Sequence, residues 1–271
     1  MIDSIFNSNK MKPLLSLALL SILVFSNCNH KGENNSMSVN GTDHIEDTIV
    51  YKSEVIVDCM PFLILKMNPK CGYVAMADSV IPDKNDSIIA MCVEAAFTGE
   101  LLKEFKSTNV AGDYVVNGKL KKGYKCKANT GFLATVNGVP FIASADKLQE
   151  WLISNHTDDF CMFQQVLLVH NGKNVYTGKP IKTTSKNIYR AACIMSDGNF
   201  AVIQSQETLS LGQFIRSLVN LGVSDALYLD MGTGWNYGWY RETRKDSPTG
   251  LFDYRTPYQT NWLLIKARDN N

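Results

Sequence analysis

The chain has 271 residues, 45% of them apolar, and a formal net charge of +1 at pH 7. The apolar fraction is enough for a packed core, and the length fits one large domain or two small ones. The balanced charge and the lack of a long basic run give no indication of a nucleic-acid or other polyanionic partner.

Residues 1–28 have the pattern of a lipoprotein-type signal peptide. Met11-Lys12-Pro13 precedes the apolar run LLSLALLSILVF, which is too short to cross a membrane as a helix. Cys28 stands where a bacterial lipoprotein carries its acylated cysteine, so we expect lipidation there, with simple secretion as the alternative. The polar residues 29–48 are expected to tether a domain at 49–271.

These features predict an exported outer-membrane or cell-surface lipoprotein, on the periplasmic side or the exterior. Only the lipid anchor is expected to contact the membrane.

Six cysteines remain in the predicted tether and domain besides Cys28, and an even number in an exported protein permits disulfides. Cys59–Cys71 is the favoured bridge, because both residues flank a probable hairpin. Cys92 and Cys193 lie in apolar runs and are expected to be buried thiols. No CxxC pair is present, which argues against a zinc site.

Strand-like runs of apolar and β-branched residues begin near Ile49 and continue to residue 76. The fully apolar run 88–93 then predicts a central strand. Glu94 follows that strand directly. A carboxylate in this position is either a salt-bridged strand end or a site residue, and the sequence leaves both interpretations open.

Three Asn-Gly pairs predict tight β-hairpins, because both residue types tolerate the positive φ angles of a two-residue turn. The pairs begin at Asn117, Asn137 and Asn171. Ser144 is expected to cap a helix with an apolar face formed by Leu148, Trp151 and Leu152.

The C-terminal half is also expected to consist of strands, with one helix between them. Residues 189–194 and 200–203 are expected to pair around a turn. Ser210 and Gln213 have the spacing of a capping box that begins an amphipathic helix.

The apolar run 226–229 is expected to form a buried strand that ends on Asp230, and residues 260–265 a closing strand. The chain lacks regular βαβ alternation. The predicted fold is therefore a single α+β domain, a strand-rich mixed sheet with β-hairpins and two or three packed helices.

Common catalytic motifs are absent, and none of the four histidines pairs at ligand spacing, so we expect no metal site. The sequence does not indicate a cofactor. The remaining candidates are two carboxylates at strand ends, Asp230 and Glu94, with Arg190 for an anionic group. Asp230 could instead cap a turn, and Arg190 could form a structural ion pair.

Aromatic residues are concentrated after Asp230, at Trp235, Tyr237, Trp239 and Tyr240. They suggest a platform on which sugar rings stack. Core or rim packing is the alternative interpretation.

Several segments between Cys92 and Ile265 resemble the phosphodiester glycosidase family. They are Arg190–Ile194 with Asp197-Gly198, the hairpin from Asn129-Thr130-Gly131-Phe132 to Asn137-Gly138-Val139, Gln164–Val169 with Asn171-Gly172, and the strand Ala226–Asp230. Their order and spacing together carry the resemblance.

The chain also departs from the family pattern. Glu94-Ala95-Ala96-Phe97 stands where the family usually has Asn-(Ala/Gly)-Gly-(Phe/Met), and Met231 replaces the glycine that normally follows the aspartate. Trp235 and Asn236 occupy positions where serines are common. The segment at Gln164 lacks most of the family's Gln-(Ser/Thr)-Gly-Pro motif.

The resemblance implies a glycoside hydrolase acting on a sugar phosphodiester or related glycan in the envelope or on a host. Its catalytic pair would be Asp230 and Glu94, with a carbohydrate or sugar-phosphate ligand. The residues implied in substrate binding are Arg190, Asn129, Gly232, Thr233, Trp235 and Asn236. The departures favour the alternative of a non-catalytic glycan-binding lipoprotein on the same fold. Sugar, linkage and oligomeric state are not predicted.

Overall fold

The computed structural model describes residues 47–98, 110–154, 160–178, 186–232, 234–255 and 261–269. These residues all belong to one unit, Gly41–Asn271. The predicted signal peptide, Cys28, most of the predicted tether and Thr233 lie outside the described residues. Neither helix in the described ranges has the length and hydropathy needed to cross a membrane.

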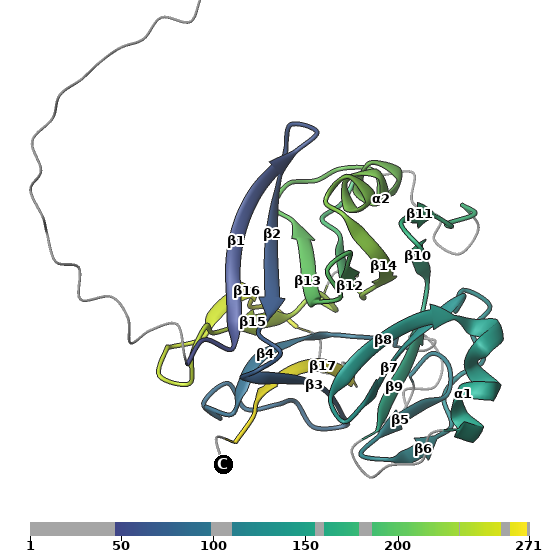
Figure 1. Cartoon of the computed structure of the whole chain (residues 1–271), viewed down its shortest axis with the longest axis horizontal. Helices are drawn as coiled ribbons and strands as arrows, with labels where there is room; N and C mark the ends of the chain where they lie inside the picture. Colours follow the sequence, from purple (N-terminus) through teal and green to yellow (C-terminus); the bar gives the residue numbers. More distant parts are fainter. Residues whose placement is uncertain are drawn as a thin grey trace, which may run out of the picture. The chain divides into compact units, whose positions relative to one another are not determined.

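The strand-rich α+β prediction is confirmed, and the strands are divided among three antiparallel sheets (Figure 1). Sheet 1 has the order β1 (Val50–Val57), β2 (Met60–Met67), β13 (Phe200–Ser205), β12 (Arg190–Met195), β14 (Val223–Tyr228), β10 (Leu167–His170) and β11 (Lys173–Asn174). Sheet 2 has the order β16 (Thr249–Phe252), β15 (Gly238–Tyr240), β4 (Ile89–Glu94), β17 (Asn261–Ala267) and β3 (Gly72–Asp78). Sheet 3 has the order β6 (Lys119–Lys121), β5 (Tyr114–Val116), β9 (Cys161–Gln165), β7 (Gly131–Val136) and β8 (Val139–Ser144).

The predicted Asn-Gly hairpins are confirmed at all three positions, joining β5 to β6, β7 to β8, and β10 to β11. Asn117, Asn137 and Asn171 have φ angles of 49°, 52° and 51°. The glycines that follow them also have positive φ angles. Both turn residues therefore adopt the left-handed geometry that matches the twist of the flanking strands.

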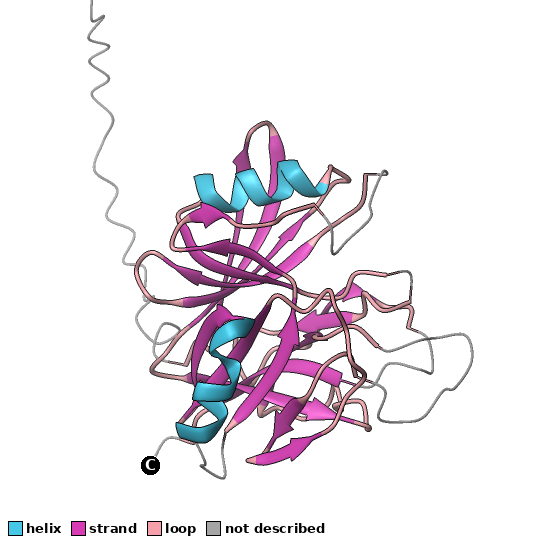
Figure 2. Ribbon diagram, turned by 90° about the vertical axis from the view of Figure 1, so that its right-hand side faces the viewer, coloured by secondary structure: helices cyan, strands magenta, loops and turns pink. Residues whose placement is uncertain are grey.

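Two α-helices cover outer faces of the sheets (Figure 2). The first, α1 (Leu148–Ser154), follows the short 3₁₀ helix Ala145–Lys147, and Trp151 packs edge-on against Phe132 of sheet 3. The second, α2 (Leu211–Asn220), packs Phe214 against Phe62 of β2 and against Tyr189, which directly precedes β12. Both predicted helices are therefore present.

The two predicted helix caps differ in outcome. Ser210 and Gln213 form the complete capping box at α2, because the Ser210 hydroxyl accepts from Gln213 N and Gln213 Oε1 accepts from Ser210 N. The predicted cap at Ser144 is wrong, since its side chain makes no cap hydrogen bond. Its hydroxyl instead interacts with the Asp146 carboxylate, and the chain enters through a 3₁₀ turn.

We predict that Ser210→Ala lowers the free energy of unfolding by about 1 kcal/mol, because it leaves helix N–H groups without their cap. Ser144→Ala is the matched control, and its effect is expected to stay within about 0.5 kcal/mol. Urea unfolding followed by circular dichroism measures both. Equal effects of the two substitutions would contradict the assignment.

The core combines residues from all three sheets, among them Leu65 of β2, Val93 of β4 and Leu133 of β7. The predicted central strand is confirmed, since β4 lies between β15 and β17 and all its residues are buried. The C-terminal ends of β4 and β14 are thereby held in the interior, where their terminal acids are positioned.

The favoured Cys59–Cys71 bridge is wrong, because neither cysteine forms a disulfide. Cys59 lies in the turn before β2 and Cys71 lies after it, so the eight-residue strand separates them by about 25 Å. A disulfide needs Cα atoms within about 7 Å. The prediction that Cys92 and Cys193 are buried thiols is confirmed.

Candidate functional site

The candidate site lies where sheets 1 and 2 meet, at the strand ends that the sequence singled out. Leu229 N donates to Arg190 O at 3.0 Å, and Asp230 N donates to Ala95 O at 3.2 Å. The chain leaving β14 is thus bonded on one side to the start of β12 and on the other to the residue that follows Glu94. The structure therefore brings Asp230, Glu94 and Arg190 into one region.

Asp230 is almost fully buried, with 8% of its surface exposed. Burial raises the pKa of its carboxyl to about 7, although backbone N–H groups of Gly232, Thr98 and Met231 act to lower that pKa. Gly232 N lies 3.0 Å from Asp230 Oδ1. A carboxyl group that titrates near neutrality can take up or release a proton at the working pH of an enzyme.

Arg190 is fully buried and fastens the loop before β15 to sheet 1. Its Nε and Nη2 both donate to Gln204 Oε1, at 2.9 and 2.7 Å. Nη2 also donates to Asn236 O at 3.2 Å, and Nη1 to Tyr237 O at 3.4 Å. These four bonds use most of the five guanidinium donors.

The charges of Glu94 and Arg190 act on each other in this interior. Burial lowers the pKa of Arg190 to about 10, whereas interactions with Cys92, Glu94 and Tyr228 act to raise it. Burial raises the pKa of the Cys92 thiol, Glu94 raises it further, and Arg190 lowers it. Glu94 itself is completely buried at the end of β4. Its position therefore suits an electrostatic role better than direct contact with a bulky ligand.

The described part of the loop after Asp230 contains three more predicted site residues, Gly232, Trp235 and Asn236. Trp235 N donates to Gly232 O at 2.8 Å, which closes a tight turn beside the Asp230 carboxylate. Asn236 is linked to Arg190 through its backbone carbonyl. Trp235 is half-buried, and its Nε1 has no hydrogen-bond partner within the described ranges.

Most of the aromatic residues after Asp230 belong to the core, which is one of the two interpretations that the sequence left open. Trp239 and Tyr240 form part of β15 and are 0% and 5% exposed, and Tyr237 is also buried. Trp239 packs with Cys92 and Trp262 in sheet 2. Trp235 is the member of this aromatic group that retains partial exposure.

Two hydrogen bonds connect Asn129 to the segment that follows Glu94. Its Nδ2 donates to Ala111 O at 2.8 Å, and Ala111 N donates to Phe97 O at 2.7 Å. Its Oδ1 is buried and has no partner among the described residues. A ligand hydroxyl is the kind of group that would satisfy such an atom.

Two residues that sequence reasoning did not assign to the site have the same property. Thr98, four residues after Glu94, has a buried Oγ1 without a partner in the described part of the chain, and so does Gln165 Nε2 at the end of β9. Val166 O, next to Gln165, accepts from Tyr228 N at 2.9 Å. The available signal was that both are polar residues close behind buried strands.

Asn261 is a further residue that the sequence did not identify. Its Oδ1 accepts from Ala96 N at 2.7 Å and its Nδ2 donates to Ala96 O at 3.1 Å, and the side chain is fully buried. This reciprocal pair fixes the segment that follows Glu94. A polar residue at the start of a closing strand was the signal in the sequence.

We predict that Asn261→Ala lowers the free energy of unfolding by about 2 kcal/mol, because it leaves the buried N–H and C=O of Ala96 unpaired. Asn85→Ala is the control, since Asn85 is exposed and its hydrogen bonds within the described ranges go to nearby Asp83. Chemical denaturation of both variants measures the difference. A loss of unfolding free energy in Asn261→Ala that is no larger than in Asn85→Ala would contradict the inferred role.

In the described ranges, no group of three or more His, Cys, Asp or Glu side chains is arranged to hold a metal ion.

No family model and no curated protein matches the chain. Among solved structures, it is similar to the catalytic domain of zebrafish N-acetylglucosamine-1-phosphodiester alpha-N-acetylglucosaminidase (NAGPA) auto-inhibited by its pro-peptide. The TM-score is 0.52 at 14% identity, over 81% of this chain and 82% of that one. A hypothetical protein from Synechocystis matches at a TM-score of 0.45 and 12% identity, over 82% of this chain and 62% of that one. The chain therefore shares its fold with the catalytic domain of a glycosidase.

Proposed function

We propose that this protein is a hydrolase that cleaves a sugar phosphodiester or a related glycan linkage, in the cell envelope or on host glycans. The observation that carries the proposal is Asp230, a buried carboxyl with a pKa of about 7 at the end of a strand. The fold, shared with the NAGPA catalytic domain, supports the choice of substrate class.

The nature of the leaving group decides whether Asp230 acts as a general acid or as a general base. Cleavage between the anomeric carbon and a phosphate oxygen releases a phosphate monoester, whose second pKa is about 6, so the departing oxygen needs little help from an acid. The attacking water is a much weaker acid and needs a base. We assign Asp230 as the general base that takes the water proton as the oxygen adds to the anomeric carbon. The bond electrons leave with the phosphate monoester.

The surrounding residues have supporting roles in this proposal. Glu94, buried beside Arg190, supplies negative charge that favours the cation developing on the sugar ring. Arg190 fixes the backbone at Asn236 and Tyr237, and its buried positive charge is proposed to attract the phosphate electrostatically. Asn129, Gly232, Thr233, Trp235 and Asn236 are proposed to shape the pocket.

Turnover of a substrate panel tests the proposal. The wild-type chain is incubated with sugar 1-phosphodiesters, matched aryl glycosides and phosphodiesters without a sugar, and released sugar is quantified by chromatography. We expect release from the sugar phosphodiesters. Cleavage of the sugar-free phosphodiesters at an equal rate would instead indicate a phosphodiesterase and would overturn the proposal.

A non-catalytic glycan-binding protein is the second candidate, favoured by the complete burial of Glu94 and the small exposed fraction of Asp230. It predicts sugar-phosphate binding by calorimetry without release of sugar, and binding that survives Asp230→Asn.

Either function is proposed to operate at the membrane surface, with Cys28 lipidated. Labelling with radioactive palmitate, lost in Cys28→Ser, tests that anchor.

A further inference from the structure

A polar cavity lies at the end of sheet 2 that is far from the candidate site. It has a volume of about 330 Å³ and contains the side chains of Arg244, Lys245 and Arg268 in its lining. The strand β17 runs from Asn261, beside the candidate site, to Ala267 at this cavity. Seven residues of extended strand place the two regions about 20 Å apart.

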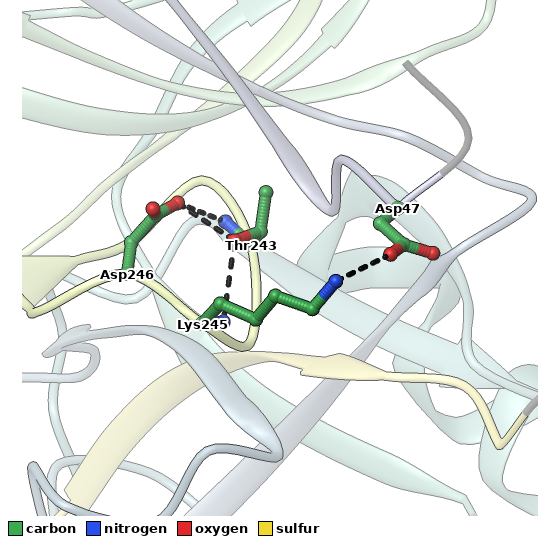
Figure 3. Close-up of polar contacts among 4 residues, drawn as sticks. All are labelled: Asp47, Thr243, Lys245 and Asp246. Carbon is green, nitrogen blue, oxygen red and sulfur yellow. Dashed lines mark hydrogen bonds and ion pairs between the residues drawn. The ribbon is translucent and has the colours of Figure 1, made fainter. Parts of the chain in front are cut away.

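The turn that presents two of these cations is held by its own hydrogen bonds (Figure 3). Asp246 Oδ2 accepts from both Thr243 N and Thr243 Oγ1 at 2.8 Å, and Thr243 Oγ1 accepts from Lys245 N at 3.2 Å. Arg244 and Lys245 therefore project from a fixed backbone, which lowers the entropic cost of holding a ligand between them.

Arg268 is preorganised from the other wall. Its Nε donates to Gly72 O at 3.1 Å, and its guanidinium lies over the Tyr73 ring, 5.7 Å from the centroid. Within the described ranges, its Nη1 and Nη2 make no hydrogen bond. A guanidinium held through Nε, with its two outer nitrogens available, matches the spacing of two phosphate oxygens.

Two carboxylates approach the cations without neutralising them fully. Lys245 Nζ lies 3.5 Å from Asp47 Oδ2, and Arg244 Nη2 lies 3.5 Å from Asp269 Oδ1. The Lys245 and Asp269 side chains are 85% and 83% exposed, so these pairs contribute little and are readily exchanged. Among the charged side chains that line the cavity, three cations face two carboxylates. A third carboxylate, Asp246, is bonded to Thr243 within the turn.

We propose that this cavity is a binding site for a phosphate group, separate from the candidate catalytic site. Arg268 would bind two phosphate oxygens, with Arg244 and Lys245 adding charge from the Thr243–Asp246 turn. The phosphate would come either from an anionic lipid headgroup or from a soluble sugar phosphate. The proposal does not depend on the catalytic role of Asp230.

Calorimetric titration of the full chain in non-ionic detergent tests the site. The probes are inorganic phosphate, glucose 1-phosphate, dihexanoyl phosphatidylglycerol and, as the zwitterionic comparison, dihexanoyl phosphatidylcholine. We expect at least one anionic probe to bind, and Arg268→Gln to weaken its binding at least about tenfold. Binding of the phosphatidylglycerol alone would identify a lipid headgroup as the ligand, and binding of glucose 1-phosphate or inorganic phosphate a soluble source.

Arg216→Gln, at an exposed arginine on α2, is the matched control and should leave binding unchanged. Arg244→Gln is the second test variant, because Arg268 also packs on Tyr73 and its loss could disturb the fold. Binding that is unaffected by both Arg268→Gln and Arg244→Gln would overturn the proposal. The absence of binding by every anionic probe up to about 10 mM would also overturn it.

Discussion

Asp230→Asn is expected to lower kcat/KM for a sugar phosphodiester by about 10²–10⁴-fold, the usual contribution of a positioned general base. The substitution keeps the shape of the side chain and removes its ability to accept a proton. Gly232 N can still donate to the amide oxygen, so the turn at 230–232 should persist. Steady-state kinetics of the wild type and the variant measure the loss.

The pH dependence separates a base from an acid at this position. Because the pKa of Asp230 is raised to about 7, its ionised form grows as pH rises toward neutrality. If that form is the base, kcat/KM rises about tenfold per pH unit below 7 and levels off above it. In Asp230→Asn this rise should disappear. Activity that falls above pH 7 in the wild type would contradict the assignment and indicate a general acid.

Local sequence signals predicted the elements whose geometry is decided within a few residues. An Asn-Gly pair imposes its own backbone angles, as at Asn137, and Ser210 with Gln213 caps a helix without help from distant residues. The division into three sheets follows instead from pairings such as Leu65 with Val202, far apart in the chain. Hydrophobic patterns do not specify the partner of a strand, so this division could not be predicted.

The same distinction applies to the candidate site. Asp230 and Glu94 were found because an acid directly after a buried run is conspicuous in sequence. Asn261 was not, because its importance lies in bonding to Ala96, 165 residues away. The sequence left Trp239 open between the platform and the core, since a run of aromatic residues and glycine does not reveal which rings a neighbouring strand will cover.

The ionised carboxylate that the proposed reaction needs is also the form that burial disfavours, so Asp230 should reduce stability at neutral pH. Its pKa is 3.8 as a free group and about 7 in the fold. Between these values the folded state holds a proton that the unfolded state has released, so the free energy of unfolding falls as pH rises. The loss is complete above pH 7 and amounts to at most about 4 kcal/mol, since one pKa unit corresponds to about 1.4 kcal/mol.

Asp230→Asn should therefore gain stability relative to the wild type between pH 4 and pH 8, by up to about 4 kcal/mol. In this variant the amide NH₂ group faces backbone N–H donors, which costs folding free energy at every pH. Because this cost does not depend on pH, it cancels when the two pH values are compared. Urea unfolding at both pH values measures the difference, with Asp253→Asn, whose carboxylate is 86% exposed, as the control. A gain that is equal at pH 4 and pH 8 would show that the Asp230 carboxylate ionises at no cost. A variant that is more stable to unfolding but no longer turns over substrate would show that the buried Asp230 carboxylate is kept for the reaction and not for the stability of the fold.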